Sequence, residues 1–156
     1  MTDAETPVER VRRVLGPSHP VRRFDQSTAT SADAAAAIGC TIAQIAKSLV
    51  FRRASGDPVL VVASGANRVD EKKLAALLGE KVGRADPAFV LAKTGYPVGG
   101  VAPVGHDPAV TVLLDADLAG QREIWAAAGA PDAVFRLTPD DLQRLTGGRF
   151  CELARR

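Results

Sequence analysis

The stretch from Gly95 to His106 most constrains how this 156-residue chain can fold. It holds four glycines and two prolines in twelve residues, a composition that excludes a helix or a central strand. Between its glycines the stretch is apolar, unlike a solvated linker. A loop of this kind lies against something, with its backbone amides exposed at close range. Two interpretations stay open from these residues: a cradle for a substrate, or a rigid buried crossover between two elements.

The remaining composition is typical of one globular domain, residues 1–156, with a core of Val, Leu, Ile and Ala. Hydrophobic residues make up 46% of the chain, which excludes a disordered protein. The net charge of +2 allows a local anionic site but not a broad nucleic-acid surface. No apolar run reaches about 18 residues and none follows a basic start, so the sequence predicts no membrane contact and a cytoplasmic location.

Metal, nucleotide and serine chemistry find no support in the sequence. The chain has two cysteines and two histidines, which lie far apart and lack the spacing of metal ligands: Cys40, Cys151, His19 and His106. We therefore expect reduced thiols, no bound metal and no cofactor. Neither a glycine-rich nucleotide fingerprint nor a phosphate-binding Lys-Ser/Thr motif follows a predicted strand. A Gly-x-Ser-x-Gly elbow is also missing, which argues against an acyl-enzyme on serine.

Hydrophobic spacing and turn residues predict short helices interleaved with strands. The expected helices cover residues 7–15, 31–37, 41–47, 72–78, 87–94 and 142–145, with Ser31 as the N-cap of the second and Leu74, Leu77 and Leu78 facing inward in the fourth. The expected strands cover residues 21–24, 48–53, 58–63, 81–85, 109–114, 123–128 and 133–137, and the pair around residues 55–57 forms a hairpin. This order predicts a mixed sheet with helices around it, not a doubly wound parallel sheet.

Lys47 is the most informative charged residue. It lies within the apolar string 42–51, where a helix is expected to give way to a strand. A lysine there either extends its ammonium to solvent at an edge or faces a cleft as a point charge for phosphate. His106, at the end of the glycine loop, is either structural or part of the cradle.

Four segments, in order along the chain, resemble the signatures of one family: residues 44–51, 70–74, 85–87 and 95–105. That family is the YbaK/EbsC-like family of prolyl-tRNA-synthetase-associated editing domains, and the likeness runs from about Val8 to Leu153. The resemblance implies a mixed α/β (α+β) fold with a central, partly barrel-like sheet surrounded by short helices. It also implies a free-standing deacylase for mischarged aminoacyl-tRNA, usually tRNA for proline carrying a small wrong amino acid.

The resemblance assigns roles to particular residues. It implies that Lys47 contacts the acceptor end of the tRNA and that the segment from Gly99 to Pro103 holds the aminoacyl ester. The expected catalytic residues are therefore Lys47, Gly99, Gly100 and Pro103. Backbone amides around Gly99 and Gly100 can polarise an ester without any side chain, and a terminal ribose hydroxyl of the tRNA would help to place the water. The expected substrate-binding residues are Thr30, Ser48, Val101, Ala102, His106, Ala127 and Val134.

The branch of the family that removes cysteine carries a serine and an aspartate near the pocket, where this chain aligns Ala127 and Val134. An apolar pocket of this kind favours alanine or 2-aminobutyrate. Serine or threonine comes next, with Ser48, Thr30 or His106 as hydroxyl partners. A hydrophobic pocket separates substrates that differ by one methylene by only ~1–3 kcal/mol, so overlapping specificity is expected.

Two other functions stay open: a non-catalytic module that binds an acceptor end or a synthetase, and a small-molecule hydrolase. The expected partners of the editing enzyme are mischarged aminoacyl-tRNA and either prolyl-tRNA synthetase or an elongation factor. The oligomeric state does not follow from the sequence.

Overall fold

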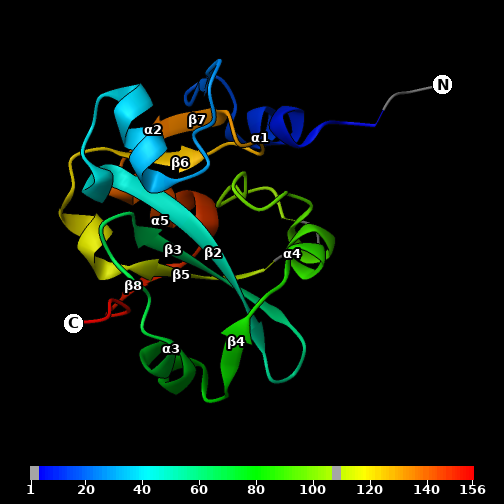
Figure 1. The fold of residues 1–156 in the computed structure, drawn as a ribbon, viewed down its shortest axis with the longest axis vertical. Helices are drawn as coiled ribbons and strands as arrows, with labels where there is room; N and C mark the ends of the chain where they lie inside the picture. The colour runs from blue at the N-terminus through cyan, green and yellow to red at the C-terminus, as the bar shows by residue number, and fades with distance from the viewer. Residues whose placement is uncertain (1–3, 107–109) are drawn as a thin grey trace.

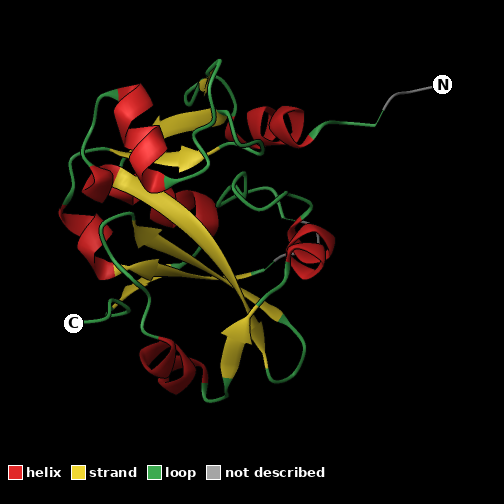
Figure 2. Ribbon diagram, in the orientation of Figure 1, coloured by secondary structure: helices red, strands yellow, loops and turns green. Residues whose placement is uncertain are grey.

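Figures 1 and 2 show the computed structural model, which describes residues 4–106 and 110–156. Its strands are β1 (Val21–Arg23), β2 (Ile45–Arg53), β3 (Pro58–Ser64), β4 (Val82–Arg84), β5 (Thr111–Asp115), β6 (Ile124–Ala127), β7 (Ala133–Leu137) and β8 (Arg149–Cys151). Its helices are α1 (Pro7–Leu15), α2 (Ser31–Ile38), α3 (Glu71–Leu78), α4 (Pro87–Thr94) and α5 (Pro139–Thr146), with short 3-10 turns η1 (Ile42–Gln44) and η2 (Ala116–Gly120). The first residue of the strand expected at 109–114 lies outside the described residues.

All eight strands join one mixed sheet, in the order β1-β7-β6-β2-β3-β5-β8, and β4 pairs with β2 beside this path. The hairpin β2–β3 is antiparallel as expected, while β3–β5, β5–β8 and β2–β6 are parallel pairs. The long, curved β2 connects the part of the sheet that holds β6 and β7 to the part that holds β3, β5 and β8 (Figure 1). The predicted mixed sheet is thus confirmed.

The central strand β3 is apolar on both faces, because each face packs against a different helix. Leu60 and Val62 belong to a core cluster that includes Leu142 of α5. Val59 and Val61 belong to a second cluster with Leu74 of α3. This two-sided burial is the physical reason for the unbroken apolar run of residues 58–63.

The edge of β2 opposite β3 is covered only at its two ends. β6 pairs with Ile45 and Ala46 at the start of the strand, and β4 pairs with Phe51 to Arg53 at its end. Within the described ranges, no strand pairs with residues 47–50 on this side. The sheet therefore has a notch at the middle of β2, and a cavity opens there.

Local signals placed most helix ends correctly. A capping box joins Thr6 and Glu9 at the start of α1, and Asp86 caps α4 in front of a proline. The expected cap of α2 was wrong by one residue, because the hydroxyl of Thr30, not Ser31, accepts a hydrogen bond of 3.0 Å from the backbone N–H of Asp33.

Two further expectations were wrong. The helix expected at 41–47 is limited to the short turn η1, since Ile45 to Lys47 pair with neighbouring strands and this pairing outweighs local preference. Leu77 was expected to face inward but is 40% exposed, whereas Leu74 is fully buried. Strand β8 was not expected at all.

Candidate functional site

The glycine loop is a largely buried segment that follows α4. Gly95 ends α4 with a φ of 77°, and Gly99 has a φ of 88°, a region that favours glycine. The backbone N–H of Gly100 donates to the carbonyl of Pro97 at 3.0 Å, which closes a turn through Val98 and Gly99. The buried residues of the loop include Val101, Ala102, Pro103 and Val104. The loop therefore packs into the molecule, as its apolar composition predicts.

Side chains fix the shape of this loop from within. The hydroxyl of Tyr96 donates to the carbonyl of Val104 at 2.7 Å, and Nε2 of His106 lies 2.8 Å from the carbonyl of Ala102. The guanidinium of Arg10 donates to the carbonyl of Gly105 and lies 5.0 Å from the centre of the Tyr96 ring. A carbonyl oxygen can only accept, so Nε2 of His106 is the donor, and burial lowers the pKa of this ring. His106 thus binds the loop itself.

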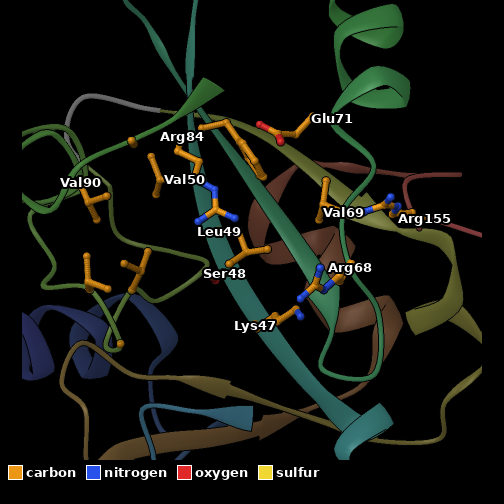
Figure 3. A pocket seen from close by; sticks show the side chains of 15 residues that line it. Lys47, Ser48, Leu49, Val50, Arg68, Val69, Glu71, Arg84, Val90 and Arg155 are labelled. Atoms are coloured by element: carbon orange, nitrogen blue, oxygen red, sulfur yellow. The ribbon is translucent and has the colours of Figure 1, made fainter. Parts of the chain in front are cut away.

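A cavity of about 520 Å³ opens at the notch of β2 and reaches the glycine loop (Figure 3). Its walls come from the middle of β2, from the segment before α3, from β4 and α4, from the loop and from the C-terminal segment. The lining residues are Lys47, Ser48, Leu49, Val50, Phe51, Arg68, Val69, Glu71, Arg84, Ala85, Val90, Val98, Gly99, Val101 and Arg155.

Four of the expected site residues meet in this cavity. Lys47 and Ser48 contribute to it from β2, and Gly99 and Val101 contribute from the loop. Residues 47 and 99 are far apart in the sequence, so the fold itself brings the two signatures together.

The other expected residues lie outside the cavity lining. Gly100 packs with its Cα against Ala130, where an added Cβ would come within 2.8 Å of backbone atoms. Thr30 is occupied as the cap of α2. Ala127 and Val134 face each other across the pair β6–β7. Of the remaining three, Ala102 and Pro103 are buried in the loop and His106 binds it.

Lys47 is held by a backbone carbonyl at the cavity wall. Its ammonium donates a hydrogen bond of 2.5 Å to the carbonyl of Asn67. Partial burial and the nearby charge of Arg68 lower the pKa of Lys47, while the carboxylate of Asp115 opposes this shift. An ammonium has three protons to donate, so Lys47 keeps further donors for a ligand.

A buried carboxylate, that of Asp115, supports the residue that binds this lysine. Asp115 is 2% exposed and accepts hydrogen bonds from the backbone N–H of Ser64 at 3.1 Å and from Nδ2 of Asn67 at 2.9 Å. Nδ2 of Asn67 also donates to Asp117 at 2.7 Å, and Arg156 binds the two carboxylate oxygens of Asp117 at 3.0 Å each. This network fixes the segment that carries the carbonyl bound by Lys47.

Three arginines of the cavity were not found from the sequence: Arg68, Arg84 and Arg155. Figure 3 shows Arg68 beside Lys47 and Arg155 beside Val69. The backbone N–H of Arg155 donates to the carbonyl of Arg68 at 2.8 Å, which brings the C-terminal segment to the cavity. These residues come from three separate segments, so no spacing pattern connects them.

In residues 4–106 and 110–156, no group of three or more His, Cys, Asp and Glu side chains could hold a metal ion. Among the helices in this part of the chain, none has the length and apolar character needed to cross a membrane.

The fold and the cavity define an α/β protein with a cavity that is rich in basic residues and is walled by a glycine loop. A family model described as the aminoacyl-tRNA editing domain matches residues 25–145. The chain therefore belongs to the aminoacyl-tRNA editing domain family, which confirms the resemblance carried by residues 44–51 and 95–105.

Relatives of nearly the same length support this assignment. The uncharacterised protein YwhH of Bacillus subtilis is 38% identical over 81% of this chain and 80% of its own length. EbsC of Enterococcus faecalis, named as a candidate Cys-tRNA(Pro)/Cys-tRNA(Cys) deacylase, is 31% identical over 76% of this chain and 73% of its own. A crystal structure described as a candidate trans-editing enzyme for prolyl tRNA synthetase is 39% identical, with a TM-score of 0.91 over 99% of this chain and 100% of that one.

Proposed function

We propose that residues 1–156 act as one trans-editing deacylase that hydrolyses the ester of mischarged aminoacyl-tRNA. The observation that carries this proposal is the meeting of Lys47 with the glycine loop across one cavity that also holds three arginines. An acceptor end presents phosphates and one aminoacyl ester within a short reach. The cations suit the phosphates and the loop suits the ester. The reaction belongs in the cytoplasm, where tRNA is charged.

We assign ester polarisation to the backbone amides of Gly99 and Val101. The N–H of Gly100, expected to share this task, already donates to the carbonyl of Pro97. Across the described chain, the N–H groups of Gly99 and Val101 have no hydrogen-bond acceptor. Both residues line the cavity. Fixed backbone donors stabilise the negative charge that develops on the carbonyl oxygen during attack by water.

In this proposal, a group of the substrate itself positions the attacking water. No serine elbow or metal cluster is found in the described residues, and the free ribose hydroxyl next to the ester can orient a water. The water adds its OH to the acyl carbon, and its proton passes to the ribose oxygen that leaves the ester. Lys47 anchors the phosphate or ribose end, since its ammonium combines one structural bond with free donors. The protein thus contributes position and electrostatics.

The cavity suits a small amino acid. Its apolar lining includes Val50, Val90 and Val101, and the hydroxyl of Ser48 adds one polar group. We expect alanine and 2-aminobutyrate as preferred groups and serine or threonine as further ones. The relative described as a trans-editing enzyme for prolyl tRNA synthetase favours tRNA for proline and a synthetase partner. An elongation factor is the other expected partner.

The test is a panel of tRNAs for proline charged with alanine, 2-aminobutyrate, serine, threonine, cysteine and proline. We expect hydrolysis of the small wrong amino acids and little of proline. Lys47→Ala should lower kcat/KM by about 10- to 100-fold, as expected for a lost charged hydrogen bond of about 1.5–3 kcal/mol. Lys81→Ala, at an exposed position, is the matched control.

Other outcomes identify the competing functions. Binding of the acceptor end without hydrolysis of any charged tRNA would favour a non-catalytic module. Equal hydrolysis of free aminoacyl esters would favour a small-molecule hydrolase. Unchanged deacylation in Lys47→Ala would contradict the role given to this lysine.

A further inference from the structure

The register of β2 decides where its backbone groups point. The N–H of Gly65 donates to the carbonyl of Ile45 at 2.7 Å, and the N–H of Arg53 donates to the carbonyl of Asp57 at 2.9 Å. Both pairs continue the β2–β3 register, in which Lys47 lies opposite Ala63. In an antiparallel pair the bonded positions alternate, so the odd-numbered residues of β2 bond to β3. The even-numbered residues direct their N–H and C=O groups to the other edge.

Two even-numbered residues, Ser48 and Val50, fall in the notch, and Ser48 is the one with a polar side chain. The pairing with β6 ends at Ala46, and the pairing with β4 begins at Phe51. In the part of the chain that the structure describes, no strand is in register with Ser48 on this edge, and no loop, turn or side-chain group bonds to its N–H or C=O. Its hydroxyl oxygen is also buried and has no partner there. One cavity-lining residue thus has a buried hydroxyl without a partner and backbone groups at an edge where no strand is in register.

The buried hydroxyl oxygen of Ser48 is costly in this arrangement unless a partner completes it. A buried polar group without a partner costs about 1–3 kcal/mol, and folded proteins rarely keep one. The cavity brings Ser48 and the loop residues Gly99 and Val101 to one space. The open edge at Ser48 therefore borders the place where the ester is assigned.

We propose that the aminoacyl residue of the substrate docks on Ser48 as a single residue added to the sheet. Its α-ammonium donates to the carbonyl of Ser48, and its ester carbonyl accepts from the N–H of Ser48. This is the pattern of one hydrogen-bonded antiparallel pair, in which two residues exchange both of their backbone bonds. The inference rests on the proposed function and names how its substrate is held.

The docked carbonyl keeps a second acceptor site for the amides of Gly99 and Val101. The ester oxygen then receives donors from the strand on one side and from the loop on the other, which is the arrangement that stabilises a developing oxyanion. Opposed residues in such a pair direct their side chains to the same face of the sheet. The substrate side chain accordingly lies beside the hydroxyl of Ser48 and the methyl groups of Val50.

The first test uses the wild-type protein, labelled with ¹⁵N, and two ligands that cannot be hydrolysed. One is 3′-deoxyadenosine with alanine on a 3′-amino group, and the other replaces the alanine by an isobutyryl group. The second ligand carries a methyl in place of the ammonium at nearly equal size. The alanyl ligand should shift the Ser48 amide resonance and slow its hydrogen exchange at least about 10-fold, while Leu49, bonded to β3, changes little.

We expect the isobutyryl ligand to bind at least about 10-fold more weakly than the alanyl ligand. Equal affinities, or an unchanged Ser48 amide at saturation, would overturn the inference. A Ser48 shift with adenosine alone would assign the notch to the base and would also overturn it.

A pair of variants gives a second measurement. Ser48→Pro removes the N–H, at an edge position that makes no bond to β3, while Ser48→Ala keeps both backbone groups. Ser48→Pro should lower kcat/KM on alanyl-tRNA at least about 10-fold, and Ser48→Ala should lower it by clearly less. Equal losses would contradict a role for the backbone. If Ser48→Pro does not fold, the ligand comparison with the wild-type protein still decides.

The two proposals fail separately. If no mischarged tRNA is hydrolysed but the alanyl ligand still protects the Ser48 amide, the proposed activity fails and the docking site stands. If mischarged tRNA is hydrolysed while both ligands bind equally and leave Ser48 unchanged, only the docking site fails.

Discussion

The ammonium of Lys47 and the backbone carbonyl of Asn67 are joined by a hydrogen bond of 2.5 Å at the wall of the cavity. The side chain of Asn67 is held in turn by Asp115 and Asp117. The position of the lysine therefore depends on carboxylates that do not border the cavity. Because Asp115 is almost fully buried, this support is part of the core and not a mobile surface contact.

Asp115→Asn should weaken both the fold and the site. The carboxylate accepts bonds from Ser64, Asn67 and the backbone of Asp117, and an amide replaces one acceptor oxygen by a donor. We expect a loss of about 1–3 kcal/mol in the free energy of unfolding, measured by denaturant titration.

Under conditions where Asp115→Asn stays folded, its kcat/KM should also fall. The reason is that the segment carrying the Asn67 carbonyl shifts, and this carbonyl holds Lys47. Asp57→Asn, at an exposed position, is the control. Full activity in a destabilised Asp115→Asn would show that the network supports the fold alone.

Lys47 should also give the activity an alkaline limit. Burial and the charge of Arg68 lower its pKa from the ordinary value of 10.5. The ammonium therefore loses its proton, and its attraction for phosphate, at a lower pH than an exposed lysine. We expect kcat/KM, corrected for spontaneous ester hydrolysis, to fall below pH 10.5 in the wild type. In Lys47→Arg this fall should move to higher pH, since a guanidinium stays charged.

Stability should change in the opposite direction over the same pH range. The unfolded chain holds the Lys47 proton more tightly than the folded chain, so the free energy of unfolding rises as pH rises between the lowered pKa and 10.5. A fall in activity that accompanies unfolding would therefore contradict this explanation. Circular dichroism at each pH separates the two effects.

The parts of the fold that could be predicted from the sequence are those set by neighbours in the chain. The capping box of Thr6 and Glu9 and the hairpin around Gly56 are determined by residues that are close together in the sequence. Residues 45–47 were expected in a helix, but they form a strand with partners at residues 63, 64, 125 and 126. These partners lie far along the chain, so the local sequence does not reveal the pairing. Strand β8 is three residues long and owes its conformation to pairing with β5.

The same distinction applies to the site. Lys47 and Gly99 belong to segments with a recognisable pattern, and the structure brings both to one cavity. Arg68 and Arg155 come together through a backbone bond between distant segments. The open strand edge at Ser48 depends on where β6 ends and β4 begins, which local sequence does not specify.

Gly100 should tolerate no side chain, although its own amide is not assigned to the ester. A Cβ there would lie 2.8 Å from backbone atoms of Ala130, and backbone cannot yield as the end of a flexible side chain can. Gly100→Ala should lower the free energy of unfolding by about 1–3 kcal/mol and displace the neighbouring Gly99. Thermal unfolding measures the first effect and deacylation the second.

Gly120→Ala provides the comparison for Gly100→Ala, since a Cβ at Gly120 meets nothing within 4 Å. It should change stability by much less. If the two variants unfold at the same temperature, the close approach between Gly100 and Ala130 is not a constraint on the loop.

His106 should make the glycine loop sensitive to acid. Burial, aided by the charge of Arg10, lowers the pKa of His106 from its ordinary value of 6.5, and the hydrogen bond to Ala102 opposes this shift only partly. As pH falls below 6.5, the unfolded chain binds a proton that the folded chain resists. The free energy of unfolding therefore decreases through this range, and the decrease ends below the lowered pKa. His106→Gln retains an N–H donor for the Ala102 carbonyl but has no titrating group.

Denaturant titrations of the wild type and His106→Gln at several pH values between 7 and 5 measure this difference. The wild type should lose stability relative to the variant as pH falls, while both respond alike to all other groups. Parallel curves would mean that the buried ring does not resist protonation. His106 donates to the carbonyl of Ala102, and this bond helps to fix the loop that carries Gly99. On acidification, the wild type should therefore also lose deacylase activity at a higher pH than His106→Gln.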